Sequence, residues 1–397
     1  MSKFIINECK AIEEKLVSLR REFHRCAEIG SHLPKTREIV CRELDRMGVP
    51  YKLNPDDSGL IAEISGNAKG KMIAFRADMD ALHITEETLL PFESEEKGLM
   101  HGCGHDAHTA MLLAAAEIIN KHKDKLKGTV RLLFQSGEET GTGAKLMLKE
   151  GALDGVDAIC ALHVGNLAGD CLPVGTFVVL PGPVSAGKDK FTITVKGKGT
   201  HSAFCSKGVD PILIGARIVE ACDEISSREL ESGTAAVLSF GSFQAGCDHN
   251  TIPDTATIKG SIRVQDVEVR NFIGERLKCI CENISKAFRA ECEVDLKRGS
   301  STVMNDDEMS SFVANSLTRV FGKEKVLTKI SNALMGSDDF ANYAERVAGV
   351  YFFLSTNNPE KNIVQANHNP EFDVDEDVLW QGAAAYCAIA FDFLLEE

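Results

Sequence analysis

Four short apolar segments, with helix-length stretches between most of them, constrain the fold of this chain more than any other feature. They are residues 71–82, 128–139, 156–165 and 349–356, each rich in the Val, Ile, Leu and Phe residues typical of buried strands. Helical patterns at 108–122 and 143–153 lie between the first three. Strands that alternate with helices usually form a parallel sheet covered on both faces. The sequence therefore predicts an α/β fold with a mostly parallel sheet flanked by helices.

The pattern changes after Pro181-Gly-Pro183, where apolar and polar residues begin to alternate. The strands expected here are 190–199, 234–244, 255–264 and 292–298, with helices at 209–230 and 266–290. This strand-helix-strand-strand-helix-strand order predicts a compact α+β, ferredoxin-like unit. With 397 residues, the chain is long enough for two domains. We expect a discontinuous catalytic, metal-binding domain formed by 1–183 and 299–397, interrupted by a lid or dimerisation domain at 184–298.

The N-terminal region before the first apolar segment has the spacing of amphipathic helices, at residues 8–26 and 34–47. The start of the chain mixes apolar and charged residues and does not have the pattern of a signal peptide. No apolar run approaches the ~20 residues needed to span a bilayer, so no membrane association is expected.

Charge and cysteine content narrow the possible partners and the compartment. The formal net charge of −15 argues against a nucleic-acid partner, because phosphate binding requires a basic face. The 13 cysteines are an odd number at low density in a long chain, which favours free thiols over disulfides. The sequence predicts a cytoplasmic location.

Residues of the kinds that bind metals follow the ends of the apolar segments. Ligands of open α/β sheets bind outside the carboxyl ends of the strands, so these groups can converge. A Gly-flanked loop, residues 101–108, adds a Cys and a His two positions apart. The residues concerned are Asp78, Asp80, Cys103, His105, Glu138, Glu139, His163 and His368.

Each of these groups has a simpler explanation when taken alone, because acids at strand ends are usually caps or solvated edges. Their joint occurrence at successive strand ends favours a metal site. Cys, His and Glu suit Zn²⁺, carboxylate-rich sites also accept Mn²⁺, and the number of groups is sufficient for two ions. Such a site activates water, and of Glu138 and Glu139 one could bind metal while the other acts as a base.

Several ordered motifs resemble the M20 metallopeptidases. Closest is their aminoacylase and amidohydrolase branch, which includes hippurate hydrolases and plant auxin-conjugate hydrolases. The motifs are RADMDAL (76–82), MHGCGHDAHTAML (100–112), FQSGEE (134–139), LH (162–163), KGKGTHSA (196–203), DP (210–211), N-x-IPD (250–254), MGSDDF (335–340) and HNPEFDVDED (368–377). They span nearly the whole chain.

The resemblance implies a role for each candidate residue. Glu138 would be the general base and proton shuttle, and Asp80 and Asp106 would orient the ligands from behind. His201 would stabilise the oxyanion across a homodimer, and Asn250 and Arg263 would contact the substrate carboxylate. The implied metal ligands are Cys103, His105, Glu139, His163 and His368, with the Cys103 thiolate bridging two ions.

Two positions depart from the family pattern. Cys205-Ser206 stands where a Pro-His pair often follows the lid histidine, and Ala27 replaces a proline near the N-terminus. Neither is a predicted ligand, so these departures bear on the substrate more than on activity.

The reaction that the resemblance implies is metal-dependent hydrolysis of N-acyl amino acids or related amides that carry a carboxylate. The metal would be Zn²⁺ or Mn²⁺, with Co²⁺ and Ni²⁺ as further options. A dipeptidase of the same family is the main alternative, with Asp338 and Asp339 as candidates to meet a substrate ammonium. A non-catalytic binding protein and a thiol redox enzyme are weaker alternatives, since Glu138 is intact and Cys103 has no Cys-x-x-Cys partner.

Overall fold

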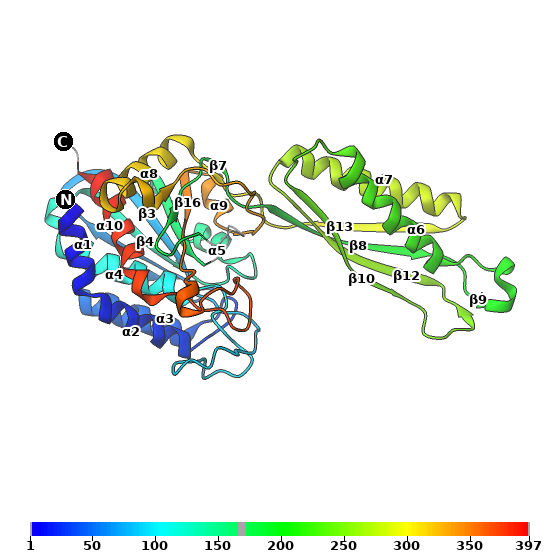
Figure 1. The fold of residues 1–397 in the computed structure, drawn as a ribbon, viewed down its shortest axis with the longest axis horizontal. Helices are drawn as coiled ribbons and strands as arrows, with labels where there is room; N and C mark the ends of the chain where they lie inside the picture. Colours follow the sequence, from blue (N-terminus) through cyan, green and yellow to red (C-terminus); the bar gives the residue numbers. More distant parts are fainter. Residues whose placement is uncertain (1, 166–171, 396–397) are drawn as a thin grey trace. The chain divides into compact units, whose positions relative to one another are not determined.

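The computed structural model describes residues 2–165 and 172–395, and these divide into two compact units. The first unit comprises residues 1–184, 303–334 and 338–397, within the described residues. The second comprises residues 185–302 together with 335–337. Figure 1 shows the elements of both units.

The first unit contains an eight-stranded mixed sheet in the order β1-β2-β4-β3-β5-β16-β6-β15. Its strands are β1 (Tyr51–Leu53), β2 (Leu60–Ser65), β3 (Ala68–Asp78), β4 (Lys127–Gln135), β5 (Ala158–Val164), β6 (Phe177–Val178), β15 (Val326–Leu327) and β16 (Ala348–Leu354). The central strands β4, β3, β5 and β16 are parallel, whereas β1, β2 and β6 join by antiparallel pairing. The predicted α/β class is confirmed, with a sheet that is parallel at its centre and mixed towards its edges.

Helices cover both faces of this sheet. They are α1 (Ser2–Ala11), α2 (Glu13–Arg25), α3 (Pro34–Met47), α4 (His105–Lys121), α5 (Gly143–Lys149), α8 (Asp307–Phe321), α9 (Ala341–Ala344) and α10 (Leu379–Leu394). Buried residues of α4 and α10 form the larger core with one sheet face, and α5 and α9 contribute to the core on the other. Both α4 and α10 are buried along nearly their whole length, which explains their continuous apolar sequences.

Two helical predictions differ from the structure in their bounds. The stretch predicted as one helix over 8–26 is two helices, because Ile12 leaves helical geometry between α1 and α2 with φ −113° and ψ 12°. The helix predicted to begin at residue 108 begins three residues earlier, at His105. His105 is therefore a helical residue rather than part of the preceding loop.

The second unit is an antiparallel four-stranded sheet in the order β10-β12-β8-β13. Its elements are β8 (Gly187–Lys196), β9 (Thr200–His201), α6 (Pro211–Glu224), β10 (Ala236–Ala245), β11 (Thr251–Ile252), β12 (Thr255–Val264), α7 (Val267–Ala287) and β13 (Glu291–Arg298). Both α6 and α7 pack on one face of this sheet around a core of its own (Figure 1). This order and pairing give the ferredoxin-like arrangement that the alternating segments predict.

Of the helices formed by the described residues, none combines the length and apolar character that a bilayer crossing requires. The cysteines within residues 2–165 and 172–395 are all free thiols. Cys171 lies outside the described residues.

Candidate metal centre

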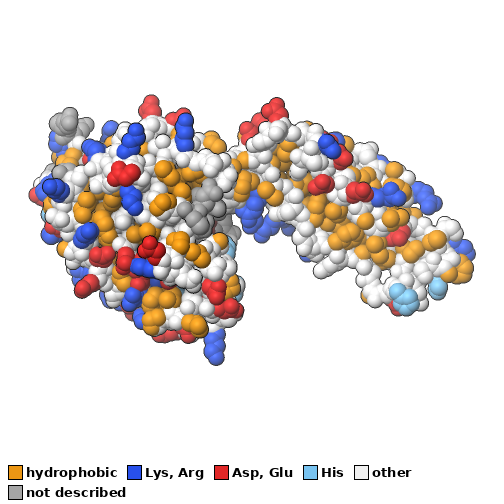
Figure 2. All heavy atoms as spheres, viewed as in Figure 1, with side chains coloured by type: hydrophobic (Ala, Val, Ile, Leu, Met, Phe, Trp, Pro, Cys, Tyr) orange, Lys and Arg blue, Asp and Glu red, His pale blue; other side chains and the backbone are white. Residues whose placement is uncertain are grey.

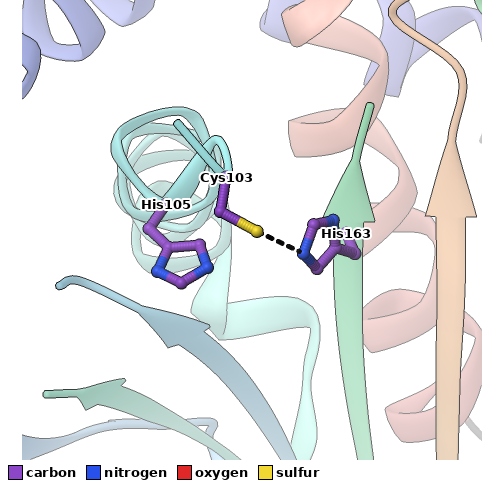
Figure 3. Close-up of side chains that lie close together, drawn as sticks. All are labelled: Cys103, His105 and His163. Atoms are coloured by element: carbon purple, nitrogen blue, oxygen red, sulfur yellow. Dashed lines mark hydrogen bonds between the residues drawn. The ribbon is translucent and has the colours of Figure 1, made fainter. Parts of the chain in front are cut away.

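The carboxyl edge of the central sheet gathers five side chains, which we call the ligand cluster: Cys103, His105, Glu139, His163 and His368. They form two overlapping groups, Cys103-His105-His163 and Cys103-Glu139-His368. Within each group one ligand atom per residue lies within 4.8 Å of the others. Cys103 belongs to both groups. Figure 3 shows its sulfur pointing towards His163, with the His105 ring beside it.

The separations within the ligand cluster match donors arranged around an ion. The Cys103 Sγ atom lies 3.5 Å from His163 Nε2, and His368 Nε2 lies 3.3 Å from Glu139 Oε1. The His105 Nε2 atom lies 4.0 Å from the same Glu139 oxygen. Metal bonds of about 2.0–2.3 Å put tetrahedral donors about 3.3–3.8 Å apart. The residues present therefore fit a divalent metal centre.

A glycine brings Cys103 and His105 over the end of β5. Gly104 immediately precedes α4 with φ +87°, a left-handed conformation that glycine adopts without strain. A Cβ atom at this position would lie 2.6 Å from Val164 Cγ2. Only glycine allows the loop to pass this close to the strand that carries His163.

Backbone carbonyls fix the orientation of two histidine rings. Nδ1 of His105 lies 2.8 Å from the carbonyl oxygen of Asp80, and Nδ1 of His163 lies 2.8 Å from that of Val164. A carbonyl only accepts, so both Nδ1 atoms carry the proton, and in the neutral ring each Nε2 presents a lone pair. Nε2 of His105 is buried and has no hydrogen-bond partner among the described residues. Such an atom is suited to a metal.

The carboxylate of Asp80 holds the segment that carries both glutamates. It accepts the backbone N–H groups of Glu138 and Glu139 at 3.0 and 3.1 Å. The Glu139 side chain joins the ligand cluster, and Glu138 forms a further close group with His105 and Glu139. One residue therefore connects the ends of β3 and β4 at the site.

Glu138 also lies beside two aspartates. Its carboxylate is grouped within 4.8 Å of those of Asp338 and Asp339. Burial, together with the charges of Asp338 and Glu139, raises the pKa of Glu138 well above its usual range. A carboxyl group in this environment has a strong affinity for a proton, as a general base that later acts as an acid requires.

Asp106 faces away from the ligand cluster. Its carboxylate accepts Arg20 Nε at 2.8 Å and lies 2.7 Å from His24 Nδ1, and it also accepts its own neighbour's backbone N–H, from Ala107. These contacts attach the first turn of α4 to α2. Any influence of Asp106 on the ligands therefore passes through the position of this helical turn.

The remaining histidines of the 101–108 segment have different environments. His108 uses both ring nitrogens, with Nδ1 2.6 Å from Asp78 Oδ1 and Nε2 accepting the Val164 backbone N–H at 2.9 Å. His101 is buried, and burial lowers its pKa to about 3, so it is neutral. Neither belongs to the ligand cluster, and His108 supports the end of β5 structurally.

A buried ion cluster around Arg76 lies behind Glu138 and is not apparent from the sequence. The Arg76 guanidinium donates to Asp78, to Asp338 at 3.2 Å and to Asp339 at 3.0 Å. The Tyr351 hydroxyl donates to Asp338 at 2.6 Å. The only sequence signal is an arginine inside the apolar segment at 71–82, where a charge needs a buried partner.

The three other predicted residues belong to the second unit. His201 on β9 is exposed, and its Nδ1 accepts the Ala203 backbone N–H at 3.1 Å. Asn250 is exposed beside it, with its backbone carbonyl accepting the Ser202 N–H at 2.9 Å. Figure 2 shows histidine side chains exposed on the surface of this unit.

Arg263 on β12 is partly engaged within the second unit. Its Nη1 atom donates to the Met335 carbonyl at 3.0 Å and to Ser337 Oγ at 3.2 Å. The guanidinium has five N–H donors, so these two bonds leave donors for another acceptor. Arg263 is thus held in place by the MGSDDF segment rather than freely solvated.

Comparison with known proteins identifies the family. The sequence pattern of peptidase family M20/M25/M40 matches residues 74–392, which is most of the chain. The chain belongs to the M20 peptidase family. A solved relative, a dinuclear metal-binding M20 peptidase from Bacillus subtilis, is 32% identical with a TM-score of 0.83. The match covers 96% of this chain and 98% of that one.

Two further relatives align over most of their length. Thermostable carboxypeptidase 1 of Saccharolobus solfataricus is 35% identical, over 98% of this chain and 97% of its own. N-acetyl-L-cysteine deacetylase of Bacillus subtilis is 36% identical, over 92% of this chain and 85% of its own. The predicted resemblance is confirmed. This M20 protein is a metallo-hydrolase that acts on linear amide bonds.

Proposed function

We propose that this M20 hydrolase cleaves the amide bond of N-acyl amino acids or of related amides that carry a free carboxylate. The observation that carries the proposal is the pair of donor groups that share Cys103, with the Glu138 carboxyl beside them. Water activation and proton transfer require these two features within reach of one another. Both occur at the carboxyl edge of the central sheet.

We propose that the ligand cluster holds two divalent ions per subunit, with Cys103 as the shared ligand. Thiolate, imidazole and carboxylate donors suit Zn²⁺, and Mn²⁺, Co²⁺ or Ni²⁺ are compatible with the same set. Bound metal would lower the pKa of a water molecule and polarise the substrate carbonyl. The dinuclear metal-binding relative from Bacillus subtilis supports the count of two.

In this proposal Glu138 does the proton chemistry. It accepts the proton of the attacking water and donates it to the departing nitrogen, so that the amine leaves neutral. Asp80 keeps Glu138 and Glu139 in register through their backbone N–H groups. His201 would help to stabilise the oxyanion, and Asn250 and Arg263 would bind the substrate carboxylate.

The Arg76 cluster argues against the dipeptidase alternative. Asp338 and Asp339 are the candidates to meet a substrate ammonium, but both are buried and form ion pairs with Arg76. Both oxygens of each carboxylate already accept hydrogen bonds within the protein, so a substrate ammonium would have to displace one of these donors. The name of the deacetylase relative indicates an acylated amino acid as its substrate, which supports the proposed class.

We further propose that the protein is a cytoplasmic homodimer formed through the second unit. Strand β10 lies at the edge of its sheet, and exposed residues alternate along most of it. Two of these exposed residues, Val237 and Phe243, are hydrophobic. Unpaired edges of this kind are suited to pairing with another chain. We propose no nucleic-acid or membrane partner.

A substrate panel tests the proposal. Purified protein loaded with Zn²⁺, Mn²⁺, Co²⁺ or Ni²⁺ would be assayed on N-acetyl amino acids and on free dipeptides of the same side chains. We expect kcat/KM to be higher for the acylated series with at least one metal. Preference for dipeptides would favour the alternative, and no turnover of either series would contradict the proposed substrate class.

A further inference from the structure

The side chain of Asn367 connects three segments of the candidate metal centre. Its Nδ2 atom donates to the Cys103 carbonyl oxygen at 3.2 Å and to the Val164 carbonyl oxygen at 3.2 Å. The same nitrogen lies 3.9 Å from Cys103 Sγ, within the range of an N–H···S contact. One amide group therefore contacts the loop before α4, the end of β5 and the loop that carries His368.

Asn367 also acts on a second predicted ligand, His163, through the Val164 carbonyl. It accepts both the Asn367 amide and His163 Nδ1, the latter at 2.8 Å. The tautomer and orientation of His163 depend on that carbonyl staying in place. Asn367 thus supports Cys103 directly and His163 through one intervening oxygen.

Gly165 provides the space that the Asn367 amide occupies. Its φ is +125°, and a Cβ atom on it would lie 2.2 Å from Asn367 Oδ1. A side chain at residue 165 would push the amide off its two carbonyls. The close approach of Gly165 to Asn367 is therefore part of the same arrangement as the contacts to Cys103.

Loop stabilisation alone does not require the contact with sulfur. A thiolate that binds metal is a charged acceptor, and the Asn367 amide nitrogen, 3.9 Å from Cys103 Sγ, can share one of its two hydrogens with it and so limit its rotation about the Cα–Cβ bond. His368 adds a second restraint, since its backbone N–H donates to the Gly102 carbonyl at 2.7 Å and its φ is +70°. Hydrogen bonds from Asn367 and His368 thus hold residues 367–368 against Gly102 and Cys103.

We infer that Asn367 is a positioning residue that fixes the Cys103 thiolate, and His163 with it, for metal binding. The inference rests on the proposed function, in which Cys103 is a metal ligand. Asn367 contacts neither substrate nor water in this role and acts only through the ligands.

Cobalt binding tests this inference with a readout other than activity. Co²⁺ bound to a thiolate gives a sulfur-to-cobalt charge-transfer band in the near ultraviolet. We expect Asn367→Leu, which keeps the size but removes the donors, to weaken Co²⁺ binding about 10- to 100-fold and to shift or weaken the band. Asn367→Ala, which needs no extra space, should act in the same direction.

Asn120 provides the matched control. Its Nδ2 atom donates to the Met47 carbonyl at 2.8 Å from the last turn of α4, away from the ligand cluster. Asn120→Leu and Asn120→Ala remove the same kind of amide-to-carbonyl bond. We expect both variants to retain the wild-type band and cobalt affinity.

The outcomes separate this inference from the proposed function. If wild-type protein gives no thiolate band, or if Cys103→Ser leaves the band unchanged, Cys103 is not the ligand and the proposed metal site is wrong. If the wild-type band is present but folded Asn367→Ala protein keeps it, with Co²⁺ affinity within about twofold, the positioning role of Asn367 is wrong and the metal site stands.

Discussion

The imidazole ring of His105 is hydrogen-bonded to the backbone carbonyl of Asp80. The Asp80 carbonyl lies 2.8 Å from His105 Nδ1, while the Asp80 carboxylate accepts the N–H groups that follow β4. A single residue at the end of β3 thus orients one predicted ligand and holds the segment that carries two glutamates. The positions of His105 and Glu139 in the ligand cluster therefore depend on Asp80, although Asp80 is not itself a predicted ligand.

Replacing Asp80 should weaken metal binding without removing a ligand. In Asp80→Ala the N–H groups of Glu138 and Glu139 lose their acceptor, so the Glu139 carboxylate loses its fixed position. We expect the Kd for Zn²⁺ to rise about 10- to 100-fold, measured by competition with a chromophoric chelator. Asp56→Ala, which removes an exposed carboxylate paired with Lys149, is the control and should leave the Kd unchanged.

Replacing Arg76 should destabilise the first unit. Arg76→Met leaves Asp78, Asp338 and Asp339 buried without their shared guanidinium, at a cost of about 3–5 kcal/mol in the free energy of unfolding. Urea denaturation followed by Trp380 fluorescence reports on this unit, because Trp380 is the only tryptophan of the chain and lies on α10.

An exposed arginine provides the comparison for Arg76. Arg46 forms ion pairs with Glu43 and Glu117 near the surface, so Arg46→Met should cost less than about 1 kcal/mol. Equal losses for the two arginine variants would contradict the importance of the buried cluster.

His24 should make stability depend on pH. Burial opposes its charge, but hydrogen bonds to Asp106 and Glu86 raise its pKa above the usual value of about 6.5. Its stabilising contribution is therefore fully present below about pH 6.5 and is lost as pH rises through the raised pKa. The difference in Tm between wild type and His24→Gln should shrink from about pH 6 to about pH 9. A difference that grows over this range would show that His24 is neutral in the folded protein.

Removing metal should affect the two units differently. Every candidate ligand group among the described residues lies in the first unit, and the second has its own core. Metal at about 100 times its Kd adds about 2.7 kcal/mol to the stability of whatever binds it. We expect a chelator to increase hydrogen exchange at the ends of β3, β4 and β5 while leaving β8 and β12 unchanged. Equal increases in both units would contradict this localisation.

Local sequence patterns predict the central strands, whereas the resemblance to the M20 family selects the five predicted ligands from the candidates that the patterns offer. The central strands β3, β4 and β5 end at or close to Asp78, Glu138 and His163, so the parallel sheet brings these side chains to one edge. Cys103, His105 and His368 lie farther from the strand ends in the sequence. The local pattern does not predict β1 and β2, which join the sheet by antiparallel pairing outside its parallel centre. Pairing at the edge of a sheet leaves little trace in the local sequence.

Side-chain direction and distant partners are harder to predict. Asp78 and Asp80 are two residues apart and would share one face of a strand. However, β3 ends at Asp78, so Asp78 turns to Arg76 and His108 while Asp80 turns to the segment after β4. The Arg76 cluster depends on Asp338, 262 residues away, which no local pattern reveals.

The kinetics and metal content of Glu138→Gln test the central claim most directly. Gln keeps the size of Glu138 but cannot accept a proton, whereas Glu139→Gln alters a predicted ligand. We expect Glu138→Gln protein to keep wild-type metal content and to lose turnover by about 10²- to 10⁴-fold, and Glu139→Gln protein to lose metal affinity. Wild-type turnover in metal-loaded Glu138→Gln protein would contradict the assignment of Glu138 as the catalytic base.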